Sequence, residues 1–232
     1  MTSTRPVLDI SQAVPRPGQD DSRLPPITLQ LLPGDFALVE TNDPERAAWF
    51  ADLCCGLVSL VEGTVTFLGR DWAAMTPDYA AALRGRIGRV FGTVAWIEFV
   101  DMATNVLLPQ LHHTRRDARE LREEAAKLAI GFGLPGLPMG HPRDLHAKDL
   151  ARAACIRAFL GEPALLVLES PLQGRFPDLA APLLEALTTA RQQGAAALWL
   201  TASDLVWRDR SVPVTHRLRL RDYGLIPARR AA

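Results

Sequence analysis

The sequence has no excess of charge of either sign. Lys and Arg together number 26, Asp and Glu also number 26, and the formal net charge is zero. Proteins that attract nucleic acid or anionic lipid through a general field carry a basic excess. The balance therefore argues against a nucleic-acid partner and against charge-driven adsorption to a membrane.

Long apolar runs and metal-ligand patterns are also missing. No run approaches the ~18–20 residues that span a bilayer, and the N-terminal segment 1–6 lacks the apolar core of a secretory signal. His141 and His146 have no Cys or carboxylate cluster at metal-ligand spacing, so we predict no metal site. The cysteines, Cys54, Cys55 and Cys155, lie in apolar helical patterns and are expected to be buried reduced thiols, which suits a cytoplasmic protein.

What is present is an alternation of strand and helix patterns over 232 residues, 48% of them hydrophobic. The segments expected to be strands are 7–10 (a short edge strand), 27–32, 36–39, 87–91, 164–168, 196–201 and 214–220, and the segment 62–69 is expected to be a strand between two turns. The expected helices are 44–57, 117–130, 149–160 and 182–193. Strands that alternate with helices predict a mostly parallel sheet covered on both faces. We expect one domain, 1–232, with a helical subdomain at about 104–160.

The segment from Gly34 to Ala48 organises the chain. It is predicted to be a buried strand, a tight loop and the start of a helix, which is the layout of a phosphate-binding loop. The same residues also make a well-capped helix start, with Asp43 at the N-cap, Pro44 at the first helical position and Glu45 in the first turn. In that interpretation carboxylates supply the negative charge that a phosphate would bring.

The order of these segments resembles the nucleotide-binding subunit of ABC transporters over nearly the whole chain. The matching landmarks are the Walker A segment 34–57, the approach to the Q-loop 83–91, the start of the helical subdomain 105–109, the signature motif and its helix 145–160, the Walker B frame 163–171 and the switch-histidine frame 198–204. The resemblance implies an α/β fold of the P-loop NTPase type. Its parts would be a mixed, mostly parallel sheet, an N-terminal antiparallel β part and a helical insert. The pattern is most similar to lipid-trafficking and lipoprotein-release systems.

The residues at the family's nucleotide-binding positions lack the family's chemistry. Three acidic residues stand where the phosphate loop has glycines, and Pro44 removes an N–H donor. Arg46 replaces the phosphate-binding Lys, and Ala47 replaces the hydroxyl that binds Mg²⁺. The altered nucleotide-site positions are Glu40, Asn42, Asp43, Glu45, Arg46, Ala47, Gly92 (Q-loop glutamine), Glu169 (Walker B aspartate), Ser170 (catalytic glutamate) and Ala202 (switch histidine). The altered signature positions are His146, Ala147, Lys148 and Asp149.

These losses, inside a frame that still aligns, predict a non-catalytic homologue that binds no ATP or Mg²⁺ and acts as a structural or regulatory subunit. The resemblance implies a membrane permease as partner, at the cytoplasmic face of the inner membrane, and pairing as a homodimer or with a paralogous subunit. Two alternatives stay open: a slow but working transport ATPase that uses Arg46 and Glu169, and a soluble adaptor that kept the fold.

Two surfaces carry the partner predictions. The cluster Trp96, Ile97, Phe99 and Val100 follows the Q-loop position, where the family meets its permease; packing in the core is an equal interpretation. In the family's head-to-tail dimer, the signature residues of one chain face the phosphate loop of the other. His146 and Lys148 would then face Glu40, Asp43 and Glu45, and direct ion pairs would replace the nucleotide.

Overall fold

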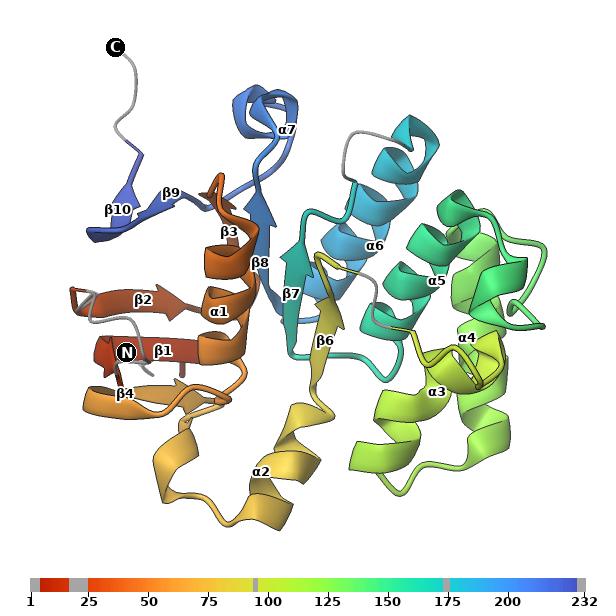
Figure 1. Cartoon of the computed structure of the whole chain (residues 1–232), viewed down its shortest axis with the longest axis horizontal. Coiled ribbons are helices and arrows are strands. Elements are labelled where there is room, and N and C mark those ends of the chain that lie inside the picture. The colour runs from red at the N-terminus through yellow and green to blue at the C-terminus, as the bar shows by residue number, and fades with distance from the viewer. Residues whose placement is uncertain (1–4, 17–24, 94–95, 173–175, 229–232) are drawn as a thin grey trace.

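A six-stranded sheet forms the centre of the molecule (Figure 1). The computed structural model describes residues 5–16, 25–93, 96–172 and 176–228. The strand order is β10-β9-β3-β8-β7-β6, parallel from β9 to β6, with β10 antiparallel to β9. The strands are β3 (Phe36–Glu40), β6 (Ile87–Val90), β7 (Leu165–Glu169), β8 (Ala196–Thr201), β9 (His216–Arg221) and β10 (Gly224–Pro227). The predicted mixed, mostly parallel sheet is confirmed.

A second, antiparallel sheet lies beside it in the order β2-β1-β4-β5. Its strands are β1 (Leu8–Pro15), β2 (Ile27–Leu31), β4 (Leu60–Phe67) and β5 (Arg70–Asp71). The predicted edge strand at 7–10 is wrong in two respects, because β1 runs for 8 residues and lies between β2 and β4. Leu8, Ile10 and Ala13 are fully buried, as expected for a strand flanked on both sides.

The helices are α1 (Pro44–Cys54), α2 (Pro77–Arg84), α3 (Met102–His113), α4 (Ala118–Gly131), α5 (Ala147–Phe159), α6 (Ala180–Gln192) and α7 (Asp204–Arg208), with 3-10 turns at 72–74, 142–144 and 177–179. Helices α3, α4 and α5 pack on one another at the end of the sheet formed by β6 (Figure 1). None of the helices in the described residues is long and apolar enough to cross a membrane.

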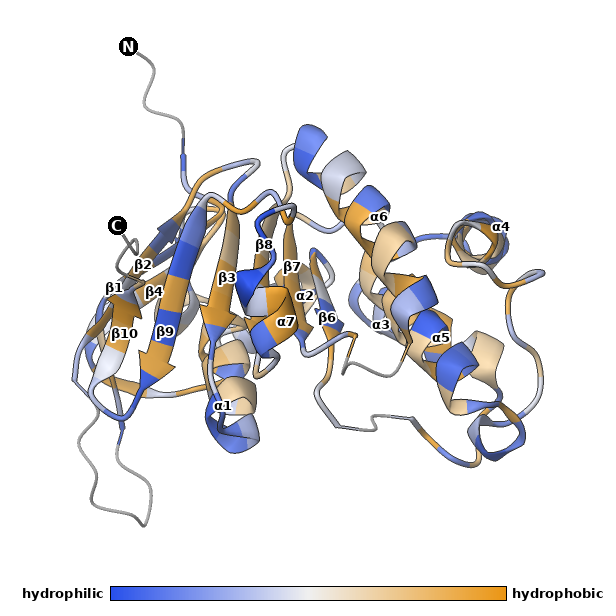
Figure 2. Cartoon of the chain, turned by 90° about the horizontal axis from the view of Figure 1, so that it is seen from above, coloured by the Kyte–Doolittle hydropathy of each residue, from blue (hydrophilic) through white to orange (hydrophobic). Residues whose placement is uncertain are grey.

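The central strands are buried on both faces. Along β3, Phe36 and Leu38 point into a core shared with α3 to α6, whereas Ala37 and Val39 point into a core shared with α1 and the antiparallel sheet. This is the period-2 alternation of a strand between two apolar layers. Figure 2 shows β3, β7 and β8 hydrophobic along their length and β9 alternating. The predicted coverage of both faces is confirmed.

Helix α5 meets the sheet at Gly88 of β6. A Cβ atom at Gly88 would lie 1.8 Å from the backbone carbonyl oxygen of Ala158. No side chain fits in that space, so the strand and the end of the helix touch backbone to backbone.

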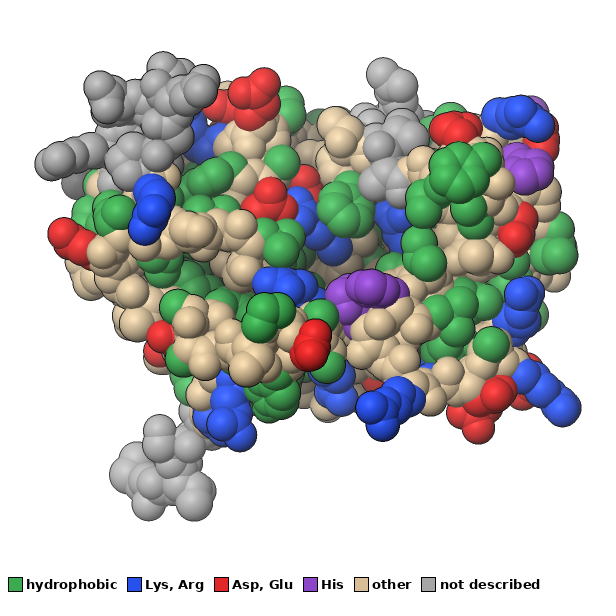
Figure 3. All heavy atoms as spheres, turned by 60° about the horizontal axis from the view of Figure 1, so that its bottom comes forward, with side chains coloured by type: hydrophobic (Ala, Val, Ile, Leu, Met, Phe, Trp, Pro, Cys, Tyr) green, Lys and Arg blue, Asp and Glu red, His purple; other side chains and the backbone are tan. Residues whose placement is uncertain are grey.

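The surface carries both signs of charge. On the face drawn in Figure 3, the Lys and Arg side chains are interspersed with Asp and Glu side chains and with hydrophobic ones. This distribution agrees with the zero net charge of the sequence and gives that face no extended field of one sign.

Candidate functional site

A cavity of about 410 Å³ lies at the carboxyl ends of β3, β7 and β8. Ligands of open α/β sheets bind at this edge. The lining includes some of the predicted nucleotide-site positions: Ala47, Gly92, Glu169, Ser170 and Ala202. Residues separated by up to 155 positions in the sequence, from Ala47 to Ala202, therefore meet where the resemblance places them.

The start of α1 is capped from within. Oδ1 of Asp43 accepts hydrogen bonds from the backbone N–H of Glu45 at 2.9 Å and of Arg46 at 3.1 Å. Pro44, at the first helical position, has no N–H to offer. The predicted N-cap is confirmed. Two donors that an anion would need at this helix end are already engaged by a carboxylate.

Glu40 does not face the cavity. It ends β3, lies directly opposite Arg219 of β9, and its Oε2 accepts from Arg219 Nε at 2.7 Å and from Arg221 at 2.8 Å. The negative charge of Glu40, one of the three acidic residues at the glycine positions, is therefore paired within the chain. The parallel pairing of β3 with β9 supplies the two cations.

The remaining loop residues also point elsewhere. Arg46 pairs with Asp43 and with Asp222, both at 3.6 Å, and does not line the cavity. Asn42 and Glu45 are exposed to solvent. Of the predicted loop positions, Ala47 alone reaches the cavity, and it brings no hydroxyl group.

Arg89 of β6 forms an ion pair with Glu169, which lines the cavity. Its guanidinium donates to Oε1 of Glu169 at 2.6 Å, to Oδ1 of Asp52 at 2.5 Å and to the carbonyl oxygen of Ala48 at 3.4 Å. The side chains of Arg89 and Glu169 are 11% and 4% exposed. Burial alone would lower the pKa of Arg89, but the hydrogen bonds that it donates to Glu169 and Asp52 outweigh burial, and the pKa is raised. The guanidinium therefore stays charged between two carboxylates.

The sequence interpretation missed Arg89. A signal existed, because a charged residue inside the apolar run 87–91 requires a buried partner. Identifying that partner as Glu169 needs the parallel pairing of β6 with β7, in which Arg89 lies opposite Val167, two residues before Glu169.

Two arginines flank the ring of Phe91. The guanidinium carbon of Arg89 lies 4.5 Å and that of Arg157 lies 5.4 Å from the ring centroid. Arg157, on α5, also lies 4.2 Å from the ring of Trp96, and burial lowers its pKa to about 10. This aromatic–arginine column, Arg89, Phe91, Arg157 and Trp96, connects β6 to α5.

The segment after the Q-loop position forms a turn held by Asn105. This amide is 2% exposed; its Oδ1 accepts from Ile97 N–H at 2.9 Å and its Nδ2 donates to the carbonyl oxygens of Ile97, Val100 and Asp101 at 2.9–3.2 Å. Phe99 stands out from this turn with 85% of its surface exposed. Of the docking candidates, Trp96, Ile97 and Val100 are partly buried and Phe99 is free to meet a partner.

The signature positions lie at the start of α5 and do not line the cavity within one chain. His146, Ala147 and Lys148 are exposed, and the His146 side chain makes no capping hydrogen bond. Asp149 pairs with Arg152 at 3.1 Å, and Arg152 in turn pairs with Asp178. The carboxylate that would have opposed the basic residues in a dimer is therefore already neutralised.

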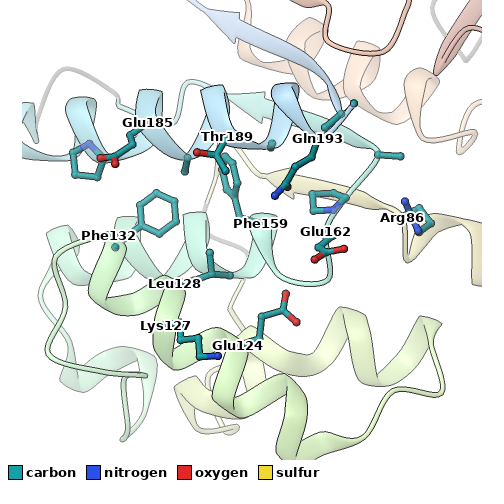
Figure 4. Close-up of a pocket in the computed structure, with 18 residues that line it drawn as sticks. Arg86, Glu124, Lys127, Leu128, Phe132, Phe159, Glu162, Glu185, Thr189 and Gln193 are labelled. Carbon is teal, nitrogen blue, oxygen red and sulfur yellow. The ribbon is translucent and has the colours of Figure 1, made fainter. Parts of the chain in front are cut away.

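A larger cavity, of about 720 Å³, lies at the opposite edge of the sheet between α4 and α6 (Figure 4). Phe132 and Phe159 contribute to its lining. Its rim carries charges of both signs, from Arg86, Glu124, Lys127, Glu162 and Glu185. No predicted site residue lies there.

At the positions where the family binds magnesium and phosphate, the carboxyl-edge cavity presents Ala47 and a Glu169 that is already paired. Magnesium needs oxygen ligands in near-octahedral geometry. Ala47 has none, and Glu169 is bound to Arg89. Among the described residues no group of three or more His, Cys, Asp or Glu side chains could hold a metal ion.

The chain has relatives among transport proteins, although no protein-family profile matches it. The lipoprotein-releasing system ATP-binding protein LolD 1 of Rhodopirellula baltica is 25% identical over 217 residues, which cover 93% of this chain and 89% of that protein. The oligopeptide transport ATP-binding protein OppF of Escherichia coli is 24% identical over 183 residues, covering 77% of this chain and 55% of OppF. The macrolide export ATP-binding/permease protein MacB of Syntrophobacter fumaroxidans is 32% identical over 149 residues, 62% of this chain and 21% of MacB. The chain thus spans about half the length of OppF and about a fifth of MacB.

Solved structures give the same fold. An ATP-binding subunit of an ABC transporter superposes with a TM-score of 0.76 and 18% identity, covering 94% of this chain and 88% of that one. A bacterial ABC transporter cassette, solved as a dimer, superposes with a TM-score of 0.78 and 17% identity, covering 94% and 96%. The two sheets and the helices beside β6 therefore form the fold of an ABC transporter ATP-binding cassette, and the sequence is similar to ATP-binding proteins of transport systems.

Proposed function

We propose that this ATP-binding cassette is a non-catalytic subunit of an ABC transporter, which docks on a membrane permease and has given up ATP. It acts as a single domain, 1–232, with the helical subdomain at 104–160 carrying the degenerate signature. It works at the cytoplasmic face of the membrane, in a system that transports lipid or lipoprotein, as the LolD relative suggests.

The ion pair between Arg89 and Glu169 carries the proposal. Glu169 stands at the position of the Walker B aspartate, and a carboxylate bound to a guanidinium at 2.6 Å has little left to offer a magnesium ion. Ser170, at the position of the catalytic glutamate, has no carboxylate to act as a general base for an attacking water. Ala202 provides no imidazole.

Electrostatics at the helix start supports the same conclusion. A carboxylate about 4 Å from a phosphate oxygen repels it by roughly 4 kcal/mol at a surface-like dielectric. Asp43 lies at that helix end and Glu45 in its first turn, whereas the charge of Arg46 is shared with Asp43 and Asp222. Phosphate therefore meets more negative than positive charge at this site.

Calorimetric titration with Mg-ATP tests the loss of nucleotide. We expect no binding at micromolar concentration, with an intact cassette of the family as positive control. Micromolar binding accompanied by phosphate release would replace the proposal with a slow transport ATPase.

Replacing Phe99 tests the permease surface. Phe99→Asp should abolish co-sedimentation with membranes that contain the permease, because a charge cannot be buried in an apolar interface without a partner. Leu205→Asp is the matched control, since Leu205 is 83% exposed on α7. An adaptor that has left the transporter would show no difference between the two variants.

A homodimer held by ion pairs has fewer charges than the sequence suggests, because Glu40 and Asp149 are paired within the chain. Lys148 and His146 of one chain would meet Asp43 and Glu45 of the other. Exposed pairs give ~0–1 kcal/mol each, so such a dimer should weaken with salt. Lys148→Glu should lower dimer formation in sedimentation velocity at low salt; an unchanged dimer would exclude these pairs.

A further inference from the structure

The cavity at the carboxyl edge keeps room for a ligand, although its charge is cancelled. Its volume of about 410 Å³ is within the range of small-molecule sites, about 300–1,000 Å³. Among the described residues that line it, Glu169 is the one ionisable side chain, and Arg89 neutralises it. The described lining therefore offers a ligand no unpaired charged side chain.

The wall of the cavity is mostly apolar. Leu172, Trp199 and Val206 contribute side chains to it, together with the proline and alanines at the start of α1. Two hydroxyl groups, of Thr93 and Ser170, also line the cavity and make no hydrogen bond to any part of the chain that the structure describes. Ser170 has a backbone φ of +45°, a conformation that costs a non-glycine residue free energy and that clusters at ligand sites.

Trp199 has a buried hydrogen-bond donor without an acceptor in the described structure. The residue is 1% exposed, and within the described structure its indole Nε1 has no hydrogen-bond partner. A buried donor without an acceptor costs about 1–3 kcal/mol.

We infer that this cavity binds an uncharged small molecule with an apolar ring or chain and a hydrogen-bonding group such as a carbonyl or hydroxyl. The inference rests on the proposed function, in which this cavity no longer binds ATP and Mg²⁺. An apolar body contacts Leu172, Trp199 and Val206, and the polar group meets the free hydroxyls. A charged ligand would lose its hydration without gaining a counter-ion.

Three isosteric probes test the charge preference. Benzamide is neutral, benzoate is anionic and benzamidine is cationic, and all share one ring size and one planar head group. We expect benzamide to show saturation-transfer signals with the full-length protein and to bind about tenfold more tightly than either charged probe. Ala202→Leu, at an exposed lining position, should abolish the signal, whereas Ala181→Leu, an exposed alanine of α6 outside the cavity, should retain it.

The outcomes separate this inference from the proposed function. Equal binding of the three probes, binding that survives Ala202→Leu, or no binding of benzamide up to its solubility limit would each overturn the inference. A parallel titration with Mg-ATP addresses the proposed function alone. Benzamide binding without Mg-ATP binding supports both.

Discussion

Two carboxylates at the carboxyl edge of the sheet, on the strands either side of β8, are both held by arginines but in different surroundings. Glu169 ends β7 and binds Arg89 of β6; Glu40 ends β3 and binds Arg219 and Arg221 of β9. Arg89 is 11% exposed, whereas Arg219 is 44% and Arg221 is 24% exposed. In both cases the pairing of adjacent strands places the arginine beside the carboxylate, but the degree of burial sets the free energy that is lost when the ion pair is broken. Water can replace a partner for Glu40 and cannot do so for Glu169.

Breaking the buried pair should have the largest effect. Arg89→Met leaves Glu169 buried without a cation and should lower the free energy of unfolding by about 3–5 kcal/mol. Urea denaturation measures the loss. Arg86→Met, at an exposed position just before the same strand, is the matched control and should change stability by less than about 0.5 kcal/mol. Equal effects of the two substitutions would contradict the role assigned to burial.

Removing both charges of the buried pair should restore most of that loss. In the double variant Arg89→Met with Glu169→Leu, no buried charge is left unpaired, and buried ion pairs are often replaceable by apolar side chains at little cost. The double-mutant cycle should give a coupling energy of about 2–3 kcal/mol by urea denaturation. A double variant as unstable as the sum of the single ones would mean that the pair contributes through packing and not through charge.

In the aromatic–arginine column, the arginines contact aromatic rings through cation–π interactions. Phe91→Leu keeps apolar volume but removes the ring that Arg89 and Arg157 share, and should cost about 1–2 kcal/mol. Thermal unfolding measures it. Tyr79→Leu, an aromatic of similar exposure on α2, is the control. A smaller effect for Phe91 than for Tyr79 would remove the column from the list of stabilising contacts.

The smallest effect is expected at Glu40, whose two arginine partners are more exposed than Arg89. Glu40→Gln should lower stability by less than about 1 kcal/mol at low ionic strength, because solvent screens both arginines. At about 1 M salt the difference from the unchanged protein should vanish. Unfolding at several salt concentrations checks this. A large, salt-independent loss would mean that Glu40 behaves as a buried residue and would erase the contrast with Glu169.

Local patterns predicted much of the fold. The bounds of β8 agree with the expected strand 196–201, and the capped start of α1 at Asp43 is as expected, because both depend on residues close in sequence. The order of strands and helices, together with the motif frames, indicated the resemblance to ABC transporter cassettes that the relatives and solved structures support. The position of β1 between β2 and β4 was missed, because pairing between distant strands leaves little trace in either strand alone.

The sequence predicted only part of the site, because several of its contacts join residues on different strands of the sheet. The convergence of Ala47, Glu169 and Ala202 on one cavity followed from the resemblance. The partners of Glu40 and Glu169 did not, because each arginine lies on an adjacent strand 80, 179 or 181 residues away. The sequence indicates that a charged side chain in an apolar strand needs a partner of opposite charge. Only the pairing of the strands identifies that partner.

The backbone contact between Gly88 and Ala158 has a mechanical consequence. Because no side chain separates β6 from the last turn of α5, this contact fixes the distance between the strand and the C-terminal end of the helix. Helix α5 has 13 residues and is about 20 Å long. His146 and Lys148 lie at the opposite, N-terminal end of α5, so a change in the angle of the helix about this contact would displace them more than the rest of the helix.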